Sequence, residues 1–274
     1  TLHLYIGGQR VQVGVSTTDT PTTIAAAVVA AITAQADVPV QAAVNGGDDS
    51  IVDLTAKHAG ESGNAIDLRV NYQTGEKLPA GVTVGITAMA AGAGNPDLTP
   101  AIAAMGDDWY NVVANPYTDA ASLGLLDAEM EDRFGPARAI DGLAFTHFTG
   151  THGQLLAFGN GRNSKHTVST GSTSSPTPPW EWCAAIASIV ADFGNRDPAR
   201  PFQTLPMVGI RAPQEVDRYT RAERDQLLND GMATFTVDRD GTVRVERLIT
   251  NYQETPFGAP DESYLDANTL LVLS

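Results

Sequence analysis

The chain has 274 residues, of which 42% are hydrophobic and 18% are charged. These fractions exclude an intrinsically disordered chain, and the length suits one large domain or two ordinary ones. With 17 Lys and Arg against 32 Asp and Glu, the formal net charge of -15 repels phosphate groups, so we expect no nucleic-acid or anionic-membrane partner. The single cysteine, Cys183, excludes an internal disulfide and a cysteine-based zinc cluster.

Short runs of alternating apolar and polar residues dominate the N-terminal third of the chain. Residues 2–6 and 11–15 flank two glycines, which predicts a β-hairpin. A Thr-Pro pair and apolar residues at helical spacing then predict a helix over residues 20–35. Further strands are expected at residues 38–44, 51–56, 65–72 and 82–88. We therefore expect a small β-rich domain with one helix over residues 1–94, followed by a turn-rich boundary.

From residue 95 onward the pattern changes to alternating strand and helix signals. Helices are expected at residues 118–134, 179–193 and 220–228, strands at 110–114, 142–145 and 205–210, and a hairpin at 235–249. Residues 164–179 are rich in Ser, Thr and Pro, which indicates an exposed loop. The fold class expected is α+β, with the β-rich domain followed by an α/β domain with a mixed sheet over residues 95–274.

Candidate catalytic and metal-binding residues are few. The five histidines are His3, His58, His147, His152 and His166. Their spacing matches no metal-binding motif. Ser164, His152 and Asp141 are weak candidates for a hydrolase triad, but the sequence lacks the Gly-x-Ser-x-Gly turn that exposes such a nucleophile. It also lacks the glycine patterns of nucleotide sites. We therefore predict no catalytic residue, no cofactor and no metal site, and a chain that is not an enzyme.

Acidic and aromatic residues each permit two interpretations. The candidates are Glu129, Glu131 and Asp132 on one predicted helix, and Trp109, Trp180 and Trp182 near predicted turns. The carboxylates could serve as a paired acid and base, but a solvated helix face is the expected role. The tryptophans could anchor a ligand or partner, but we expect them to fill the core.

Seven short segments occur in an order that is typical of one protein family. They are residues 95–98 (NPDL), 108–111 (DWYN), 115–119 (NPYTD), 197–205 (DPARPFQTL), 230–235 (DGMATF), 249–253 (ITNYQ) and 263–270 (SYLDANTL). Together they closely resemble the tail sheath protein of Mu-like contractile-tailed bacteriophages. The first 90 residues are similar to the variable small domain of that family, which the resemblance places on the outside of the sheath, with the α/β domain nearer the tube.

The resemblance implies a structural subunit rather than an enzyme. Family members form helically stacked six-subunit rings around a tail tube and contract to drive the tube through the host envelope. The partners implied are the chain itself, as a helical homo-oligomer in its full-length form, the tail tube protein, and baseplate and tail terminator proteins. The location implied is the virion, after a period in the host cytoplasm.

The resemblance also implies that residues are missing at both ends of this chain. The family has segments before residue 1 and beyond residue 274 that link neighbouring subunits. We therefore expect a truncated core that stays monomeric or weakly associated. Arg200 and the charged residues between 238 and 247 suit either contacts between subunits or an ordinary solvated surface.

Three other functions stay open at this point. The chain could serve as the sheath of a related contractile injection machine, such as a bacteriocin or a secretion system. It could be a surface-binding module, which only the β-rich domain suggests. An α/β hydrolase is the third, and the missing nucleophile turn argues against it.

Overall fold

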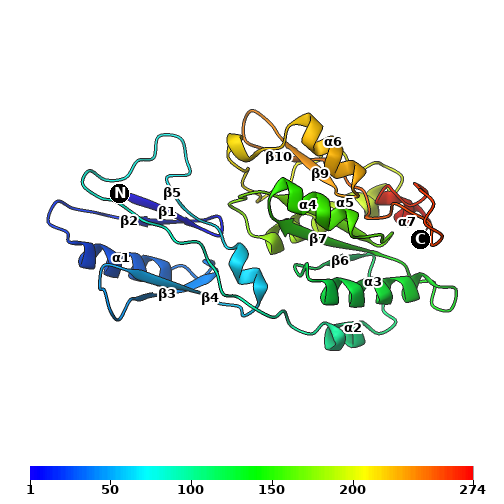
Figure 1. Ribbon diagram of the computed structural model, residues 1–274, viewed down its shortest axis with the longest axis horizontal. Helices are drawn as coiled ribbons and strands as arrows, with labels where there is room; N and C mark the ends of the chain where they lie inside the picture. Colours follow the sequence, from blue (N-terminus) through cyan, green and yellow to red (C-terminus); the bar gives the residue numbers. More distant parts are fainter. Residues whose placement is uncertain (274) are drawn as a thin grey trace. The chain divides into compact units, whose positions relative to one another are not determined.

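The computed structural model describes residues 1–273, and the chain divides into two compact units (Figure 1). The first unit comprises residues 1–94 and 176–178, and the second comprises residues 95–175 and 179–274. With 31% helix and 20% strand, arranged in several small sheets, the chain confirms the expected α+β class.

A three-stranded antiparallel sheet forms one part of the first unit. β1 (Leu2–Ile6) lies in its centre, between β2 (Gln9–Val13) and β5 (Leu68–Val70). Gly7 and Gly8 join β1 to β2, and both have positive φ, at 54° and 79°. Glycine suits this two-residue turn because it has no Cβ to clash in the left-handed region.

A helix and a hairpin complete the first unit. α1 (Pro21–Thr33) begins after Thr20, whose side chain and that of Thr23 each accept the other residue's backbone N–H. This reciprocal capping satisfies N–H groups that the first turn leaves without helical partners. The helix contacts β3 (Val40–Val44), which pairs with β4 (Val52–Ala56) in a separate antiparallel hairpin.

Two strands expected in the first unit differ from the structure. The strand predicted at residues 65–72 is reduced to β5, because η1 (Glu61–Ala65) is a 3₁₀ helix that runs into its start. The strand predicted at residues 82–88 is wrong, since those residues form neither helix nor strand. A segment of alternating apolar and polar residues forms a strand only where the edge of a neighbouring strand can pair with it. Within residues 1–273, no strand pairs with residues 82–88.

A parallel sheet between layers of helices forms the centre of the second unit (Figure 1). β7 (Leu143–Thr149) lies between β6 (Val112–Ala114) and β8 (Thr167–Ser172). α3 (Ala120–Phe134) packs on one face, through Met130 on Ala144, and α5 (Pro179–Arg196) packs on the other. Alternate residues of β7 therefore meet different helices.

The remaining elements surround this sheet. They are α2 (Thr99–Met105), α4 (His152–Asn160), η2 (Glu215–Asp217), α6 (Arg221–Asn229), β9 (Thr234–Val237), β10 (Val243–Arg247) and α7 (Asn268–Leu273). β9 and β10 form an antiparallel hairpin, and the residue before β9 bridges to Thr170 of β8, so the combined sheet is mixed. Of the strand expected at 205–210, only residues near its start pair with β10, through the bridge between Pro206 and Arg244.

The exposed loop predicted for residues 164–179 is wrong. Residues 167–172 form β8, and every one of them is buried although five of the six are Ser, Thr or Gly. The hydroxyl groups of this strand are buried because other parts of the second unit supply their hydrogen-bond partners. A composition rich in Ser and Thr indicates a solvated segment only when such hydrogen-bond partners are missing.

Candidate functional site

The three residues proposed as a hydrolase triad bind different partners. Ser164 donates its hydroxyl hydrogen to Asp127 at 2.8 Å, and His152 Nε2 lies 3.2 Å from the carbonyl oxygen of Glu223. Asp141 uses its backbone carbonyl to accept the indole N–H of Trp109 at 2.8 Å. A nucleophile, base and orienting acid of a triad bond one another, whereas these hydrogen bonds join each of the three residues to a different group.

His147 of β7 is fully buried among hydroxyl groups and an aromatic ring. Its Nδ1 lies 2.9 Å from Thr170 Oγ1, its Nε2 lies 2.8 Å from Ser172 Oγ, and its ring stacks on Trp182 with centroids 4.6 Å apart. The Thr170 hydroxyl donates to a backbone carbonyl at 3.3 Å, so it accepts from Nδ1–H, and Nε2 then accepts from Ser172. Burial lowers the pKa of His147 to about 3, so the ring stays neutral and serves as a connector of β7 and β8.

The other buried reactive groups are equally confined. Burial raises the pKa of the Cys183 thiol to about 12, and its Sγ donates to the carbonyl oxygen of Asn115 at 3.4 Å. A thiol of this kind is a poor nucleophile and a poor metal ligand. Among residues 1–273, no group of three or more His, Cys, Asp and Glu side chains is placed to hold a metal ion.

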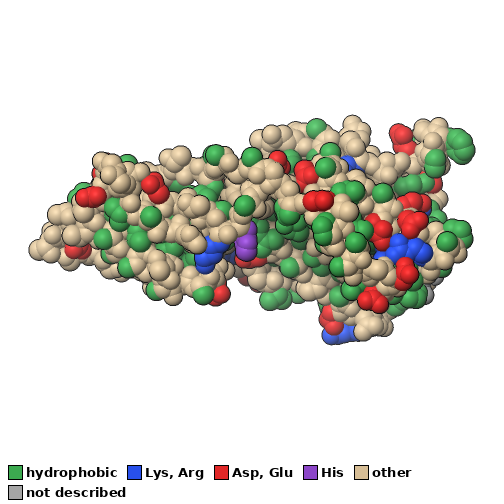
Figure 2. All heavy atoms as spheres, turned by 90° about the horizontal axis from the view of Figure 1, so that it is seen from below, with side chains coloured by type: hydrophobic (Ala, Val, Ile, Leu, Met, Phe, Trp, Pro, Cys, Tyr) green, Lys and Arg blue, Asp and Glu red, His purple; other side chains and the backbone are tan. Residues whose placement is uncertain are grey.

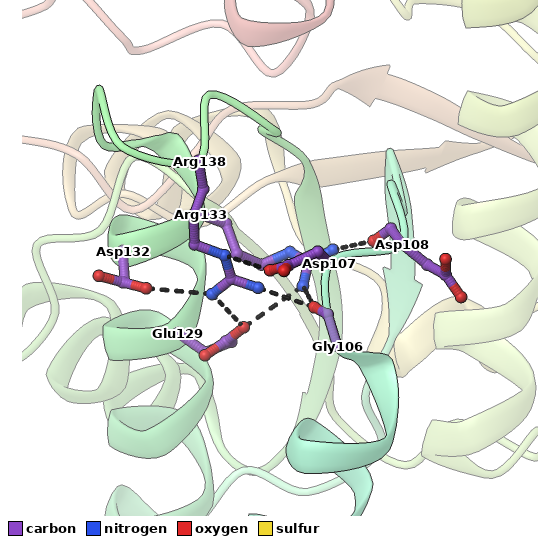
Figure 3. A network of polar contacts seen from close by, with 7 residues as sticks. All are labelled: Gly106, Asp107, Asp108, Glu129, Asp132, Arg133 and Arg138. Carbon is purple, nitrogen blue, oxygen red and sulfur yellow. Dashed lines mark hydrogen bonds and ion pairs between the residues drawn. The ribbon is translucent and has the colours of Figure 1, made fainter.

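The structure brings together a network of arginines and carboxylates that the sequence interpretation missed (Figure 3). Arg133 of α3 is completely buried and donates to the carbonyl oxygens of Gly106, at 2.7 Å, and of Asp108. The same guanidinium lies 3.3 Å from Glu129, one helical turn earlier. Buried arginine is stable only when its donors are paired, and here backbone carbonyls supply most of the pairing.

Arg138, in the loop after α3, binds two of the three acceptors that Arg133 uses (Figure 3). It donates to Glu129 at 2.9 Å and to the Gly106 carbonyl at 2.7 Å, and it pairs with Asp132 at 3.0 Å and Asp107 at 3.1 Å. The hydrogen bonds that Arg138 donates to Asp132 and Glu129 raise its pKa. This network fixes the loop between α2 and β6 against α3.

The expectation of a solvated carboxylate face on α3 was therefore only partly right. Glu131 and Asp132 are exposed, but Glu129 lies within the arginine network. Glu131 bonds Lys165 at 2.9 Å and His166 at 3.1 Å, and Lys165 also lies 4.3 Å from the centre of the Phe134 ring. Burial raises the pKa of Glu131, but the hydrogen bonds and charges of Lys165 and His166 together outweigh this effect, so its pKa is lowered overall.

The tryptophans divide between core and surface. Trp182 is fully buried, and its indole N–H donates to Ser175 at 2.9 Å. Trp109 is 49% exposed, so the expectation of a core position is wrong for this residue. Its indole N–H nevertheless donates to the backbone carbonyl of the buried residue Asp141.

Most charges of the β9–β10 hairpin pair within the chain. Arg244 binds Asp238 at 2.5 Å, Glu246 binds Arg224 of α6 at 2.7 Å, and Arg247 binds Asp266 at 3.0 Å. These pairs hold α6 and the C-terminal segment against the hairpin. The second unit is thus a tightly connected scaffold, in which pairs of charged side chains join helices, strands and loops to one another.

Comparison with known proteins agrees with a scaffold of this kind. Residues 91–251 match the family described as phage tail sheath protein central domain, which is more than half of the chain. The chain belongs to the phage tail sheath family. All 274 residues align at 40% identity with the Mu-like prophage FluMu tail sheath protein of Haemophilus influenzae. The alignment spans 55% of that protein, so the chain has about half the length of this curated relative.

Solved structures of sheath tail proteins align over 85% of the chain. The one from Desulfitobacterium hafniense has a TM-score of 0.49 and 16% identity and is covered over 56% of its length. The one from Listeria innocua has a TM-score of 0.48 and 13% identity and is covered over 54% of its length. The sequence matches confirm, at the level of the family, the resemblance that the short sequence segments indicated. Each helix within residues 1–273 is too short or too polar to cross a lipid bilayer.

Proposed function

We propose that the chain is the core of a structural subunit of a contractile phage tail sheath. The observation that carries the proposal is the 40% identity to a Mu-like prophage tail sheath protein along the full 274 residues. The subunit polymerises as helically stacked six-subunit rings around a tail tube. Contraction of this lattice then drives the tube through the host envelope.

The internal connections of the second unit support a mechanical role. A subunit that transmits force needs its elements held to one another, and the arginine network fixes the 106–108 loop to α3. Heterologous contacts between identical subunits generate open helical arrays, and two alternative arrangements of such contacts can store conformational energy. The work then comes from rearranging subunits, and no catalytic group is required.

Partners and location follow from the same proposal. The partners are further copies of the chain, a tail tube protein, and the baseplate and terminator proteins at the tube ends. The protein is part of the virion and passes through the host cytoplasm before assembly. In the assembled sheath, the β-rich unit faces outward and the α/β unit lies nearer the tube.

Negative-stain electron microscopy tests the proposal. The full-length protein and the 1–274 chain are examined at matched concentration, and both are checked for folding by circular dichroism. Tubes or stacked rings from the full-length protein, with dispersed particles from the 1–274 chain, are expected. Dispersed particles from both folded proteins would contradict a sheath role.

A further inference from the structure

A turn close to the C-terminus presents an aromatic side chain to solvent. Residues 254–262, here called the Phe257 turn, carry Phe257 with 96% of its surface exposed, and Pro256, Ala259 and Pro260 beside it are exposed as well. Figure 2 shows hydrophobic side chains on a protrusion at one end of the second unit. An aromatic tip of this kind gains free energy when a partner surface covers it.

The turn is held in shape by its own hydrogen bonds. Thr255 N–H donates to the Ala259 carbonyl at 2.8 Å, and Gly258 N–H donates to the Thr255 carbonyl at 2.9 Å. At its base, the Tyr252 hydroxyl donates to Asp261 at 2.8 Å. Because the backbone is already ordered, little conformational entropy is lost when the aromatic tip binds.

A second exposed apolar surface lies in the segment 206–221. Val208, in a turn, is 86% exposed, and Val216, in η2, is 85% exposed. Three arginines and two carboxylates stand in this segment, which makes it net positive in a strongly acidic chain. The Phe257 turn has the opposite character, with three carboxylates and neither Lys nor Arg. The two surfaces are therefore complementary in charge and alike in having exposed apolar residues.

The two surfaces lie beside opposite ends of β10. Met207 bonds Val243, the first residue of β10, whereas Ile249, just past the last residue of β10, pairs with Asp266. In Figure 1 the gold segment before α6 lies beside the turn of the β9–β10 hairpin, and the orange-red segment before α7 lies near the C-terminus. Surfaces placed in this way meet between two copies rather than within one, and their repetition gives an open array.

We propose that the Phe257 turn of one copy docks on the segment 206–221 of the next copy in a head-to-tail contact. The inference rests on the proposed sheath function and names the partner surfaces within it. The apolar tip is covered by the valine-bearing turns, and the carboxylates at its base face the arginines of the neighbour. The contact is heterologous, so each copy uses both surfaces.

Polymerisation of the full-length protein measures the contribution of each surface. Phe257→Ser and Val216→Ser are each expected to raise the protein concentration needed for tube formation at least tenfold, while the melting curve of the dispersed protein is unchanged. Leu125→Ser is the matched control, since Leu125 is an exposed apolar residue of α3 outside both surfaces. The control is expected to polymerise as the unmodified protein does.

A charge exchange tests the pairing directly. Glu262→Lys and Arg221→Glu alone are each expected to weaken polymerisation, and the double variant is expected to restore it, because every copy then carries both changes. Failure of the double variant to exceed the single variants would overturn the pairing.

Thiol cross-linking separates this contact from a symmetric one. Full-length protein carrying Phe257→Cys and Val216→Cys is treated with a short bis-maleimide, and the full-length protein without these changes, in which Cys183 is buried, is treated in parallel as the background. A ladder of cross-linked dimers, trimers and longer chains is expected from the double variant, with monomers from either single variant. Dimers from Phe257→Cys alone would overturn the head-to-tail contact.

The outcomes distinguish this inference from the proposed function. Tubes from Phe257→Ser at the unmodified concentration would overturn the inference and leave the sheath role intact. A Phe257→Ser variant that self-assembles unchanged but no longer co-assembles with another tail component would likewise overturn the inference. Dispersed particles from the unmodified full-length protein would overturn both.

Discussion

β8 and the segment 82–90 reverse the usual relation between polarity and burial. β8 is built largely from hydroxyl-bearing residues and glycine, yet all of it is buried. The segment 82–90 alternates apolar residues as a strand does, yet it forms no strand and Ile86 is 44% exposed. The difference shows that a partner, more than the residue types themselves, decides whether a segment joins the sheet.

The aromatic ring that stacks on His147 of β7, the strand beside β8, gives the largest expected effect. Trp182→Ala removes a fully buried ring that stacks on His147, and it should lower the free energy of unfolding by about 3–5 kcal/mol. Urea denaturation of the 1–274 chain measures this loss. Trp109→Ala is the control, and its loss should be clearly smaller because half of that ring is already in water. Equal losses from the two variants would contradict the packing described.

Glycine substitutions compare the two segments directly. At Gly171 of β8 an added Cβ would overlap the Leu155 side chain and lie 3.1 Å from the Phe148 carbonyl oxygen, so Gly171→Ala should destabilise the chain by about 1–3 kcal/mol. At Gly85 an added Cβ meets nothing within 4 Å, so Gly85→Ala should be neutral or stabilise by about 0.4–1 kcal/mol. Thermal melts of both variants decide between these outcomes, and a destabilised Gly85 variant would show that the segment 82–90 is packed after all.

The buried imidazole predicts how stability depends on pH. The pKa of His147 falls from its ordinary 6.5 to about 3 in the folded chain, so between these values only the unfolded chain binds the proton. The stability linked to this group is complete above pH 6.5 and declines as the pH falls toward 3, by about 1.4 kcal/mol per pH unit.

A variant that lacks the His147 imidazole isolates its contribution to the pH dependence of stability. His147→Gln keeps an amide that can bond the Thr170 and Ser172 hydroxyls, and its unfolding free energy should fall less steeply with decreasing pH than that of the unmodified chain. Denaturant titrations from pH 7 to pH 4.5 measure both slopes. Parallel slopes would mean that His147 is protonated in the folded chain.

The smallest expected difference in stability comes from one valine-to-threonine change in β8 and one in the segment 82–90. Val168→Thr places a hydroxyl in the apolar core under β8 without a partner and should cost about 1 kcal/mol. Val84→Thr lies in the partly exposed segment, where water can bind the hydroxyl, and should change stability by less than about 0.5 kcal/mol. Differential scanning calorimetry of the pair is the measurement, and a larger effect at Val84 would reverse the comparison.

Features encoded by neighbouring residues were predictable from the sequence. The Thr220–Glu223 capping pattern marks the start of α6, and its reciprocal hydrogen bonds are present at 2.7 and 3.3 Å. The apolar stripe of α3 likewise appears as buried Leu123, Leu126 and Met130. Such signals succeed because the interacting groups lie within one or two helical turns of each other.

The arginine network was not predictable in the same way. Arg133 and Gly106 are 27 positions apart, and Arg138 and Gly106 are 32 apart. Within the sequence these residues read as ordinary charged and turn positions. A weak signal was available in Arg133 itself, which occupies the apolar stripe of α3 and is therefore placed on the buried face.

The sequence by itself determined the α+β class, the acidic surface, the helix caps and hairpin turns, and membership of the phage tail sheath family. These follow from composition, from periodicity and from short segments whose order is preserved. Only the tertiary structure decided that the hydroxyls of β8 are buried, that Glu129 joins Arg133 and Arg138, and that His147 stays neutral. The physical reason is that a polar group can be buried only when its partner is present, and in these cases the chain brings the partner from a distant position.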